Sequence, residues 1–505
     1  MPSIMRATAR RPPDDLSQIP VTKVALRTRD GLVTSIAIAL IATLLPANPS
    51  SAAWRPNGTP IATSTDLEFS PFVVPDGQGG AFISWVRYST TAGGVYALAI
   101  GADGEIRAGW PTDGLLLPEL TGGSDPCMTE DGLGGAVVTA TGPSFVGLRH
   151  LTPPGVSAST RTAFGVSRNA VPSTSEPLPV AATMHSGLVL SVVIPDGVGG
   201  AYVSFMDNQR FYDVGYVRHY AADGSFTQLS LSDLTGCGNF YCFLETPTLC
   251  PDGAGGVFVA WSQGCGARVL RLTPELTPAP GWPSTGVVAE DCPMSAGYVG
   301  ICADGSGGAY VAWQGSPNGI DLQHLTGSGA TAPGWADVTG LVLSHHPTLP
   351  GFLRPYGWAF CSIVPDQLGG ALVAWTDGRA DTGDVYVQRV RSDGSIAPGW
   401  APEGVAVGMA PGMQENPVVA ADGSGGAWIA WQDDLDSTIR ANHVDASGAN
   451  DLPSTPAGIL VSGGPGPRFV PASRATALTG RSSPGSMIGM AMATSTPVTS
   501  PWTRP

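Results

Sequence analysis

The sequence predicts an all-β protein, a seven-bladed β-propeller of four-stranded antiparallel blades. Three observations lead to this fold class. A phrase of the type DGxGGA, followed by apolar residues, recurs seven times, and most copies supply four short candidate strands. The chain is also rich in turn formers, with 68 Gly and 46 Pro among its 505 residues. Four strands in a unit of about 50 to 60 residues match the strand number and the length of a propeller blade.

Each copy of the phrase begins with an aspartate, and successive aspartates lie 52 to 65 residues apart. The seven anchors are Asp76, Asp131, Asp196, Asp252, Asp304, Asp366 and Asp422. Nine residues later six copies have an aromatic residue and the second has Ala140; the six are Trp85, Phe205, Trp261, Trp313, Trp375 and Trp431. Seven copies in one register indicate a structural repeat.

The phrase predicts a tight hairpin turn that leads into a buried strand. Its glycines can take positive φ, and the aspartate can bond to its own backbone. After the first anchor, Ala81, Ile83 and Trp85 alternate with Phe82 and Ser84. Both faces are apolar or small, as in a strand covered on both sides. Because the anchor recurs in every copy, we assign it to the turn and not to catalysis.

The fourth strand of a unit follows a Gly-Trp pair and a second glycine. The pairs are Gly109-Trp110, Gly281-Trp282, Gly334-Trp335 and Gly399-Trp400. Two further segments resemble this strand, Trp54–Ala62 before the first copy and Ala457–Val461 after the last. Either could complete the last blade and remove open sheet edges, and the sequence does not decide between them.

We predict three regions: an export leader at 1–52, the propeller at 53–462 and a tail at 463–505. In the leader, basic residues precede the apolar run Gly31–Leu45, which ends at Pro46. The small residues at 50–52 suit a cleavage site, so we expect a secreted or cell-surface protein without a membrane span after leader removal. An uncleaved signal anchor is the alternative, although the run is short for a membrane span.

The tail is rich in Gly, Pro, Ser, Thr and Ala, which predicts a disordered or surface-attached extension. It carries four arginines and no acidic residue, and the leader carries six basic and three acidic residues. The net charge of −15 therefore becomes −22 for the propeller region alone. Such a body repels nucleic acid and anionic membranes, so we expect neither as a partner.

Eight cysteines lie in the exported part, and an even number there favours disulfides. The repeat register suggests a bridge from Cys242 to Cys265 within one blade and a second from Cys250 to Cys302 across blades. A zinc site is less favoured, because Cys237 and Cys242 lack a second matching pair.

In this strand order the loops after each Trp strand and the connectors between blades share one rim, opposite the DGxGGA turns. Loops on a rigid scaffold commonly carry function. The predicted binding residues on this rim are Arg210, Tyr212, Tyr241, Tyr356, Trp358 and Arg379, and Arg87, Tyr88, His345 and His346 share the rim. Aromatic rings with arginines suit a glycan or protein partner. The alternative is that they are ordinary exposed loop residues.

Asp377, Asp381 and Asp384 supply enough oxygens for calcium, which would be the protein's one cofactor. Their spacing is not that of an EF-hand, so a solvated turn is the alternative. His345 and His346 are adjacent, and adjacent strand residues point to opposite faces, so we do not expect them to share a metal.

Residues 69–85 and 414–433, with Asp384–Val390 and Gly399-Trp400, resemble repeats in large secreted bacterial proteins. The resemblance covers residues 54–462. It implies a propeller-like extracellular protein of a largely uncharacterised group, often with a C-terminal surface-sorting domain, and it brings no catalytic residues. The sixth copy alone has both the Trp-x-Asp-x-Arg and the Tyr-x-Gln-Arg patterns.

Two functions remain open. The first is a monomeric, non-enzymatic scaffold that binds a glycan, protein or surface partner at the loop rim. The alternative is a glycan-active hydrolase or lyase with a site at the central channel, which needs inward-facing acids and bases. The strands before the anchors are mostly apolar, for example Phe72, Val73 and Leu249, which favours binding. No GxSxG elbow in a plausible context, P-loop or HExxH motif occurs.

Overall fold

The computed structural model describes residues 61–462 with gaps. The residues left out within this range are 62–63, 65, 90–92, 143–144, 152–187, 209–212, 223–224, 236–246, 263–266, 290–298, 315–318, 337–339, 347–360, 381–382, 434, 436–437 and 451–456. The predicted leader and tail lie outside the described residues. The chain divides into two compact units, Met1–Ser51 and Ala52–Pro505, and every described residue belongs to the second.

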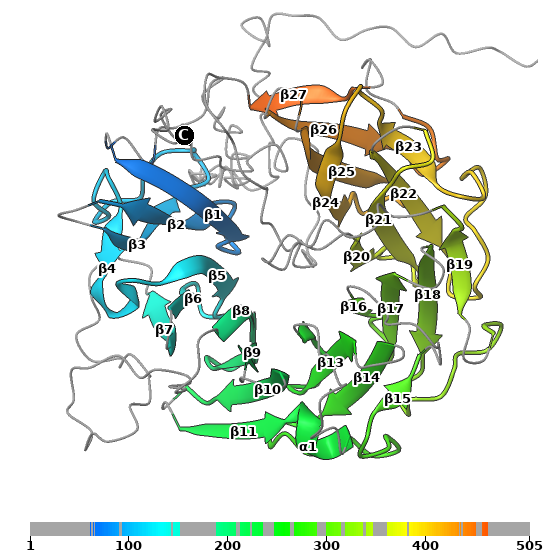
Figure 1. Ribbon diagram of the computed structural model, residues 1–505, viewed down its shortest axis with the longest axis horizontal. Helices are drawn as coiled ribbons and strands as arrows, with labels where there is room; N and C mark the ends of the chain where they lie inside the picture. Colours follow the sequence, from blue (N-terminus) through cyan, green and yellow to red (C-terminus); the bar gives the residue numbers. More distant parts are fainter. Residues whose placement is uncertain are drawn as a thin grey trace, which may run out of the picture. The chain divides into compact units, whose positions relative to one another are not determined.

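The described residues form seven antiparallel sheets that follow one another along the chain, which confirms the predicted fold class (Figure 1). We number them as blades 1 to 7. Blade 1 contains β1 (Leu67–Pro75), β2 (Ala81–Tyr88), β3 (Gly94–Ile100) and β4 (Leu115–Leu117), and blade 2 contains β5 (Ser124–Glu130), β6 (Ala136–Gly142) and β7 (Phe145–Leu151). Blade 3 contains β8 (Leu188–Pro195), β9 (Ala201–Asn208), β10 (Asp213–Tyr220) and β11 (Phe226–Ser230).

The remaining four blades each have four strands. Blade 4 contains β12 (Thr248–Pro251), β13 (Val257–Ser262), β14 (Ala267–Leu272) and β15 (Val287–Val288), and blade 5 contains β16 (Val299–Ala303), β17 (Ala309–Gln314), β18 (Ile320–Leu325) and β19 (Leu341–Ser344). Blade 6 contains β20 (Cys361–Pro365), β21 (Ala371–Asp377), β22 (Asp384–Val390) and β23 (Val405–Gly408), and blade 7 contains β24 (Gln414–Ala421), β25 (Ala427–Asp433), β26 (Thr438–Val444) and β27 (Ile459–Ser462).

Helices are short in the described part of the chain. A 3-10 turn, η1 (Pro118–Leu120), follows blade 1, and one helix, α1 (Leu231–Thr235), follows blade 3. No helix among the described residues is long and apolar enough to cross a membrane.

The anchor aspartate closes the turn between the first two strands of every blade, as predicted. In blade 6, Asp366 Oδ1 accepts hydrogen bonds from the backbone N–H groups of Leu368 at 2.8 Å and Gly370 at 2.7 Å. A Cβ at Gly370 would lie 2.1 Å from the carbonyl oxygen of Val390, so only glycine fits there. The repeated Asp-x-x-Gly-Gly is therefore a steric and hydrogen-bonding requirement of the hairpin.

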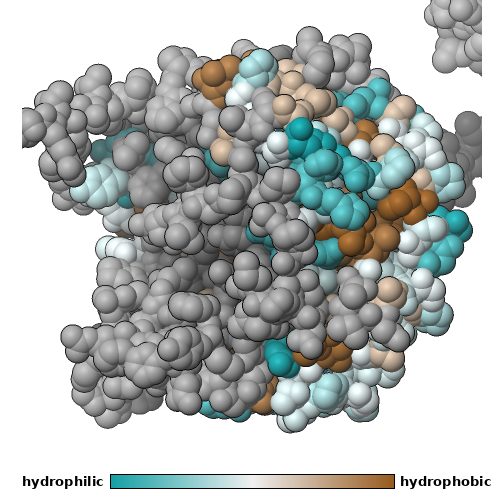
Figure 2. Space-filling model, turned by 45° about the vertical axis from the view of Figure 1, so that its right-hand side comes forward, coloured by the Kyte–Doolittle hydropathy of each residue, from teal (hydrophilic) through white to brown (hydrophobic). Residues whose placement is uncertain are grey.

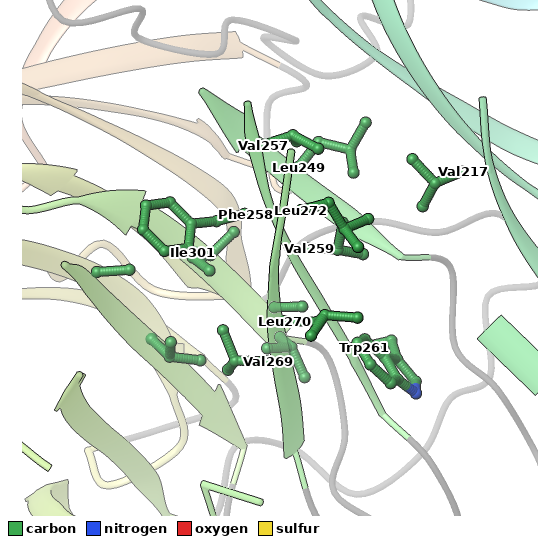
Figure 3. Close-up of a cluster of buried hydrophobic side chains, with 14 of the residues drawn as sticks. Val217, Leu249, Val257, Phe258, Val259, Trp261, Val269, Leu270, Leu272 and Ile301 are labelled. Carbon is green, nitrogen blue, oxygen red and sulfur yellow. The ribbon is translucent and has the colours of Figure 1, made fainter. Parts of the chain in front are cut away.

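The second strands are buried on both faces. Figure 3 shows this in blade 4, where Phe258 and Val259 of β13 point to opposite sides within one apolar cluster that also contains Trp261. All five tryptophans of the Trp strands are fully buried, and each such side chain stabilises the fold by roughly 1.5–3 kcal/mol. The glycine before the fourth strand makes room for the indole, because a Cβ at Gly404 would lie 2.5 Å from Trp375.

The Gly-Trp pairs of blades 4, 5 and 6 couple each of these blades to the next. The indole N–H of Trp335 in blade 5 donates to the carbonyl oxygen of Ser392 in blade 6 at 2.8 Å, and Trp400 donates to Ala446 of blade 7 at 3.2 Å. The glycine before Trp400 permits this approach, since a Cβ at Gly399 would lie 2.3 Å from the Ser447 carbonyl oxygen. The pair is thus a contact between blades.

The outer strand of blade 7 comes from the C-terminal of the two candidate segments. β27 pairs antiparallel with β26, with Ala441 opposite Ile459 and Arg440 opposite Leu460. The C-terminal candidate therefore completes blade 7. Of the N-terminal candidate the structure describes Ile61, which is buried in the apolar cluster of blade 1.

The predicted bridge between Cys250 and Cys302 is wrong, because no disulfide joins them. They occupy equivalent positions in neighbouring blades and therefore point in the same direction. The Cys250 sulfur accepts a hydrogen bond from the N–H of Ala303 at 3.1 Å, and Cys302 packs in the cluster shared with blade 6. Burial raises the pKa of the Cys361 thiol to about 12. Cys242 and Cys265, the other predicted pair, lie outside the described residues.

Candidate functional site

We call the seven anchor turns the turn rim. The loops after the second strands, together with the connectors between blades, are called the loop rim. On the turn rim the second oxygen of every anchor bonds to one basic side chain of its own blade. In chain order these partners are Arg107, His150, His219, Arg271, His324, Arg389 and His443. Six of the seven are the penultimate residue of the third strand, a signal that the sequence contained and that we did not use.

The pKa values of the turn-rim carboxyls match a structural role. Burial tends to raise the pKa of Asp131, and hydrogen bonds from His150 and the turn backbone outweigh it, so the pKa lies below its usual value. The same balance lowers the pKa of Asp304 and Asp422. Both oxygens of each carboxylate are already bonded, so these groups stabilise the turns and are not free to react.

On the loop rim, Asp377 and Arg379 form a compact pair in blade 6. Asp377 is fully buried at the end of β21 and accepts hydrogen bonds from the indole N–H of Trp375 at 2.9 Å and the Ser344 hydroxyl at 3.1 Å. The guanidinium of Arg379 donates to both carboxylate oxygens, at 2.5 to 3.0 Å. Burial tends to raise the pKa of Asp377, and these bonds more than offset it, so its pKa is lowered.

The aromatic ring of Tyr386 completes the surroundings of Arg379. The guanidinium carbon lies 3.8 Å from the ring centroid, a cation–π contact, and the Arg379 side chain is 16% exposed. With its carboxylate and ring partners in place, the arginine has one orientation. The predicted binding residue is therefore part of a pre-organised inner layer.

An outer, solvent-exposed layer surrounds this pair. Glu403 lies 3.9 Å from the Arg379 guanidinium, 3.4 Å from His345 Nδ1 and 3.0 Å from His346 Nε2. Its side chain is 44% exposed, and those of His345 and His346 are 72% and 39% exposed. The hydrogen bond to His346 lowers the pKa of Glu403. The two histidines, predicted not to share a metal, instead contact one carboxylate.

Sequence reasoning missed Glu403, although a signal was present. Glu403 directly precedes the glycine of its Gly-Trp strand, and Asp113 occupies the same position in blade 1. Asp113 lies 2.9 Å from Arg87, which is buried and also pairs with Glu68. In both blades, therefore, the acid at this position contacts an arginine that follows shortly after the tryptophan of the second strand.

The other predicted site residues divide into two groups. Arg210, Tyr212, Tyr241, Tyr356, Trp358 and Asp381 lie outside the described residues. Tyr88 is 71% exposed, whereas Asp384 is buried and pairs with Asp377 across the hairpin. Of the six predicted binding residues, Arg379 is therefore the one that lies among the described residues.

For the predicted calcium site, the described residues give one constraint. Both Asp377 oxygens are bonded to a guanidinium, so calcium would have to compete with Arg379. No group of three or more His, Cys, Asp or Glu side chains suited to a metal occurs among the described residues. Figure 2 shows hydrophobic residues in small separate groups among hydrophilic ones on the described part of one face.

No family model and no curated protein matches this chain. Among solved structures it is similar to polysaccharide lyase Uly1, with 10% identity over 79% of this chain and 81% of that one and a TM-score of 0.38. It is also similar to the intramolecular trans-sialidase from Ruminococcus gnavus, with 11% identity over 72% and 90% of the two chains and a TM-score of 0.33. A prolyl endopeptidase structure gives 13% identity over 78% and 51% and a TM-score of 0.42. Likenesses this remote carry no argument about activity.

Proposed function

We propose that this protein is a secreted, extracellular β-propeller that binds a glycan or protein partner through its loop rim and is not an enzyme. The observation that carries the proposal is the two-layered cluster at blades 5 and 6. Arg379 is held by Asp377 and Tyr386, and exposed imidazole and carboxylate groups lie directly outside it. A rigid inner layer under an accessible outer one reduces the entropy lost on binding.

The chemistry of the outer layer suits hydroxyl-rich partners. Imidazole N–H groups donate hydrogen bonds to sugar hydroxyls or backbone carbonyls, and the carboxylate accepts hydrogen bonds from sugar hydroxyls or backbone amides. We propose that Tyr356 and Trp358, which lie between His346 and Cys361 in the sequence, contribute planar surfaces for binding. We propose Arg210, Tyr212 and Tyr241 as further binding residues on the same rim.

The net charge of the propeller region limits which classes of partner we expect. The propeller region carries a net charge of −22, which disfavours polyanions such as nucleic acid and acidic polysaccharides. This field attracts basic glycans and basic protein surfaces, and it does not repel neutral glycans. An export leader at 1–52 agrees with an extracellular partner.

The test is a glycan array with neutral, basic and acidic glycans, using the chain from residue 53 onward. Replacement His346→Ala, Tyr356→Ala or Trp358→Ala is expected to weaken binding at least tenfold, the size of a typical hot-spot loss. Arg391→Ala is the matched control, because Arg391 is 53% exposed within an ion pair away from this cluster. Unchanged binding in all three variants would exclude the cluster as the site.

The glycan-active alternative is tested in the same way. One acid with a raised pKa is Glu130, next to the anchor Asp131 on the turn rim: burial raises its pKa, and Asp131 adds to the effect. The same glycans should be assayed for release of reducing ends or unsaturated sugars. Turnover that disappears in Glu130→Gln, or in any loop-rim variant, would replace the binding proposal by the enzymatic one.

Calcium at Asp377, Asp381 and Asp384 is a separate proposal. A rise in melting temperature with millimolar calcium, reversed by EDTA and absent in Asp381→Asn, would support it. Equal melting temperatures in calcium and EDTA would remove it and leave the glycan proposal untouched.

A further inference from the structure

Arg218, on β10 of blade 3, is a buried cation that has no acidic partner among the described residues. It is 6% exposed, and it bonds to neutral acceptors. Its Nε donates to Gln228 Oε1 at 3.0 Å, one terminal nitrogen donates to the same oxygen, and the other donates to the Tyr220 hydroxyl at 2.9 Å. Other arginines of the described blades pair with a carboxylate, namely Arg87, Arg107, Arg271, Arg379, Arg389 and Arg440. A buried charge normally needs a counter-charge, so Arg218 stands apart from them.

The repeat shows that the fold does not require a charge at this position. Arg218 directly precedes His219, the partner of the anchor in blade 3, and the equivalent residues of blades 5 and 6 are Gln323 and Gln388. Both amides are buried and donate to a backbone carbonyl of their own blade, at 2.8 Å and 2.6 Å. A neutral side chain therefore satisfies the same place in the blade, and the guanidinium of blade 3 needs another explanation.

Three aromatic rings surround this guanidinium. Its central carbon lies 4.3 Å from the ring centroid of Phe226, 5.6 Å from that of Phe205 and 5.7 Å from that of Tyr220. The cation–π contacts offset part of the cost of burying the charge and restrict the orientation of the group. Three of the five N–H groups are used in the hydrogen bonds to Gln228 and Tyr220, so two remain as donors for a ligand.

The outer strand of blade 3, β11, gives a ligand access to Arg218 (Figure 1). Its residues Phe226, Thr227 and Gln228 are exposed, Phe226 at 40%. The register places Gln228 opposite Arg218 and Phe226 opposite Tyr220, so these side chains share the face that carries the guanidinium. Exposed side chains change rotamer readily, and a movement of Gln228 or Phe226 opens the site without disturbing the core.

We propose that Arg218 binds the carboxylate of a small acidic ligand at this outer part of blade 3. A guanidinium presents paired N–H groups that match the two oxygens of a carboxylate. The ligand supplies the counter-charge that the described chain lacks there, and the rings of Phe226 and Tyr220 flank it. The site lies in blade 3 and the loop-rim cluster in blades 5 and 6, so the two can be tested separately.

The charge of the propeller region selects among anions. With a net charge of −22, this region disfavours ligands in proportion to their negative charge. A phosphate group carries close to two charges at neutral pH, whereas a carboxylate carries one. A ligand with a single carboxylate is therefore the anion that we expect to bind.

Thermal melting of the chain from residue 53 tests the proposal, because a ligand that binds the folded state raises the melting temperature. The probes are sodium glucuronate, sodium acetate, sodium phosphate and glucose, at millimolar concentrations and equal ionic strength. Both carboxylates are expected to raise the melting temperature, and glucose is not. A larger effect of glucuronate assigns the site to sugar acids, and equal effects assign it to small carboxylic acids in general. No effect of either carboxylate, or an effect of phosphate alone, overturns the proposal.

Arg218→Gln introduces the side chain that blades 5 and 6 have at this position, so the blade should still fold. Titration calorimetry is expected to show at least tenfold weaker binding of glucuronate to this variant. His346→Ala, in the loop-rim cluster, is the control and should bind glucuronate as the unchanged chain does. Undiminished binding in Arg218→Gln, or a loss in His346→Ala instead, would contradict the site in blade 3.

Gln228→Glu decides the question even if Arg218→Gln does not fold. It places a carboxylate opposite Arg218 on an exposed strand, so it should raise the melting temperature of the ligand-free chain and abolish the effect of glucuronate. Thr227→Glu is the matched control, because the side chain of Thr227 points to the other face of the same strand, and both properties should persist. An unchanged melting temperature in Gln228→Glu, with glucuronate still binding, would show that Arg218 needs no counter-charge.

Discussion

The turn rim and the loop rim are built from the same blades, yet they follow opposite rules. On the turn rim every blade repeats one arrangement, an aspartate that bonds to its own turn and to one basic side chain. On the loop rim the described blades differ: Arg379 pairs with Glu403, which also contacts the two histidines, whereas Arg87 of blade 1 pairs with Asp113 and Glu68. Repeated residues therefore stabilise the scaffold, and the variable ones are where specificity can reside.

Blade 1 shows that the turn rim preserves an interaction and not a residue position. Six blades place the basic partner on the third strand, but blade 1 has Ala99 there, opposite Phe82. Arg107, beyond the end of β3, reaches Asp76 instead. The buried carboxylate needs a cationic or hydrogen-bonding partner, and the chain supplies it from the nearest available place.

The largest expected effect is on stability: removing the buried indole of blade 6 should cost more than removing the half-buried indole of blade 7. Trp375→Ala should lower the free energy of unfolding by about 3–5 kcal/mol, since it leaves a cavity between blades. Trp428→Ala should cost clearly less, because Trp428 is only half-buried. Urea denaturation of both variants measures the difference. Equal losses would mean that the two blade faces are equally covered.

The second prediction concerns the anchor itself. Asp366→Ala should cost about 3 kcal/mol, because it leaves two turn N–H groups and the guanidinium of Arg389 without their acceptor. Asp366→Asn keeps one acceptor oxygen for the turn and should cost less. Asp393→Ala, in an exposed turn of the same blade, is the control and should leave the denaturation midpoint unchanged. Similar midpoints for all three variants would contradict the structural role of the anchor.

The fold was predictable to the extent that it is periodic. Seven copies of the anchor turn, each followed by an apolar strand, imply seven hairpins, because sterics and hydrogen bonding leave Asp-x-x-Gly-Gly few alternatives. The pairing of Cys250 with Cys302 was mispredicted for the same reason, since equal positions in a repeat point the same way and do not face each other. Glu403 was missed although Asp113 marks the same position in blade 1, because its partner His346 lies 57 residues away in the connector between blades 5 and 6. Side chains that meet across blades are set by packing and not by local pattern.

Acid pH should weaken the turn rim, because its anchor aspartates are hydrogen-bonded in their charged form. The folded-state pKa values of Asp131, Asp304 and Asp422 lie below the ordinary aspartate value, so their contribution to stability is complete above that value and is lost as pH decreases. Thermal melting is therefore expected to depend little on these groups between pH 5 and 7 and to decline below about pH 4. Asp304→Asn should flatten the acid limb of this profile. An unchanged acid limb would assign acid unfolding to other carboxyls.

The smallest effect on stability is expected at the candidate binding cluster. His346→Ala and Glu403→Gln remove exposed partners of an inner layer that Asp377 and Tyr386 already hold, so each should shift the free energy of unfolding by less than about 0.5 kcal/mol. Tyr386→Phe is the control for the inner layer, because it keeps the ring under Arg379. Chemical denaturation gives the stability, and the glycan array gives the binding. A large loss of stability in His346→Ala would assign the histidine to the scaffold and remove it from the candidate binding site. Lost binding at unchanged stability would instead assign a binding role to the loop rim and a structural role to the turn rim.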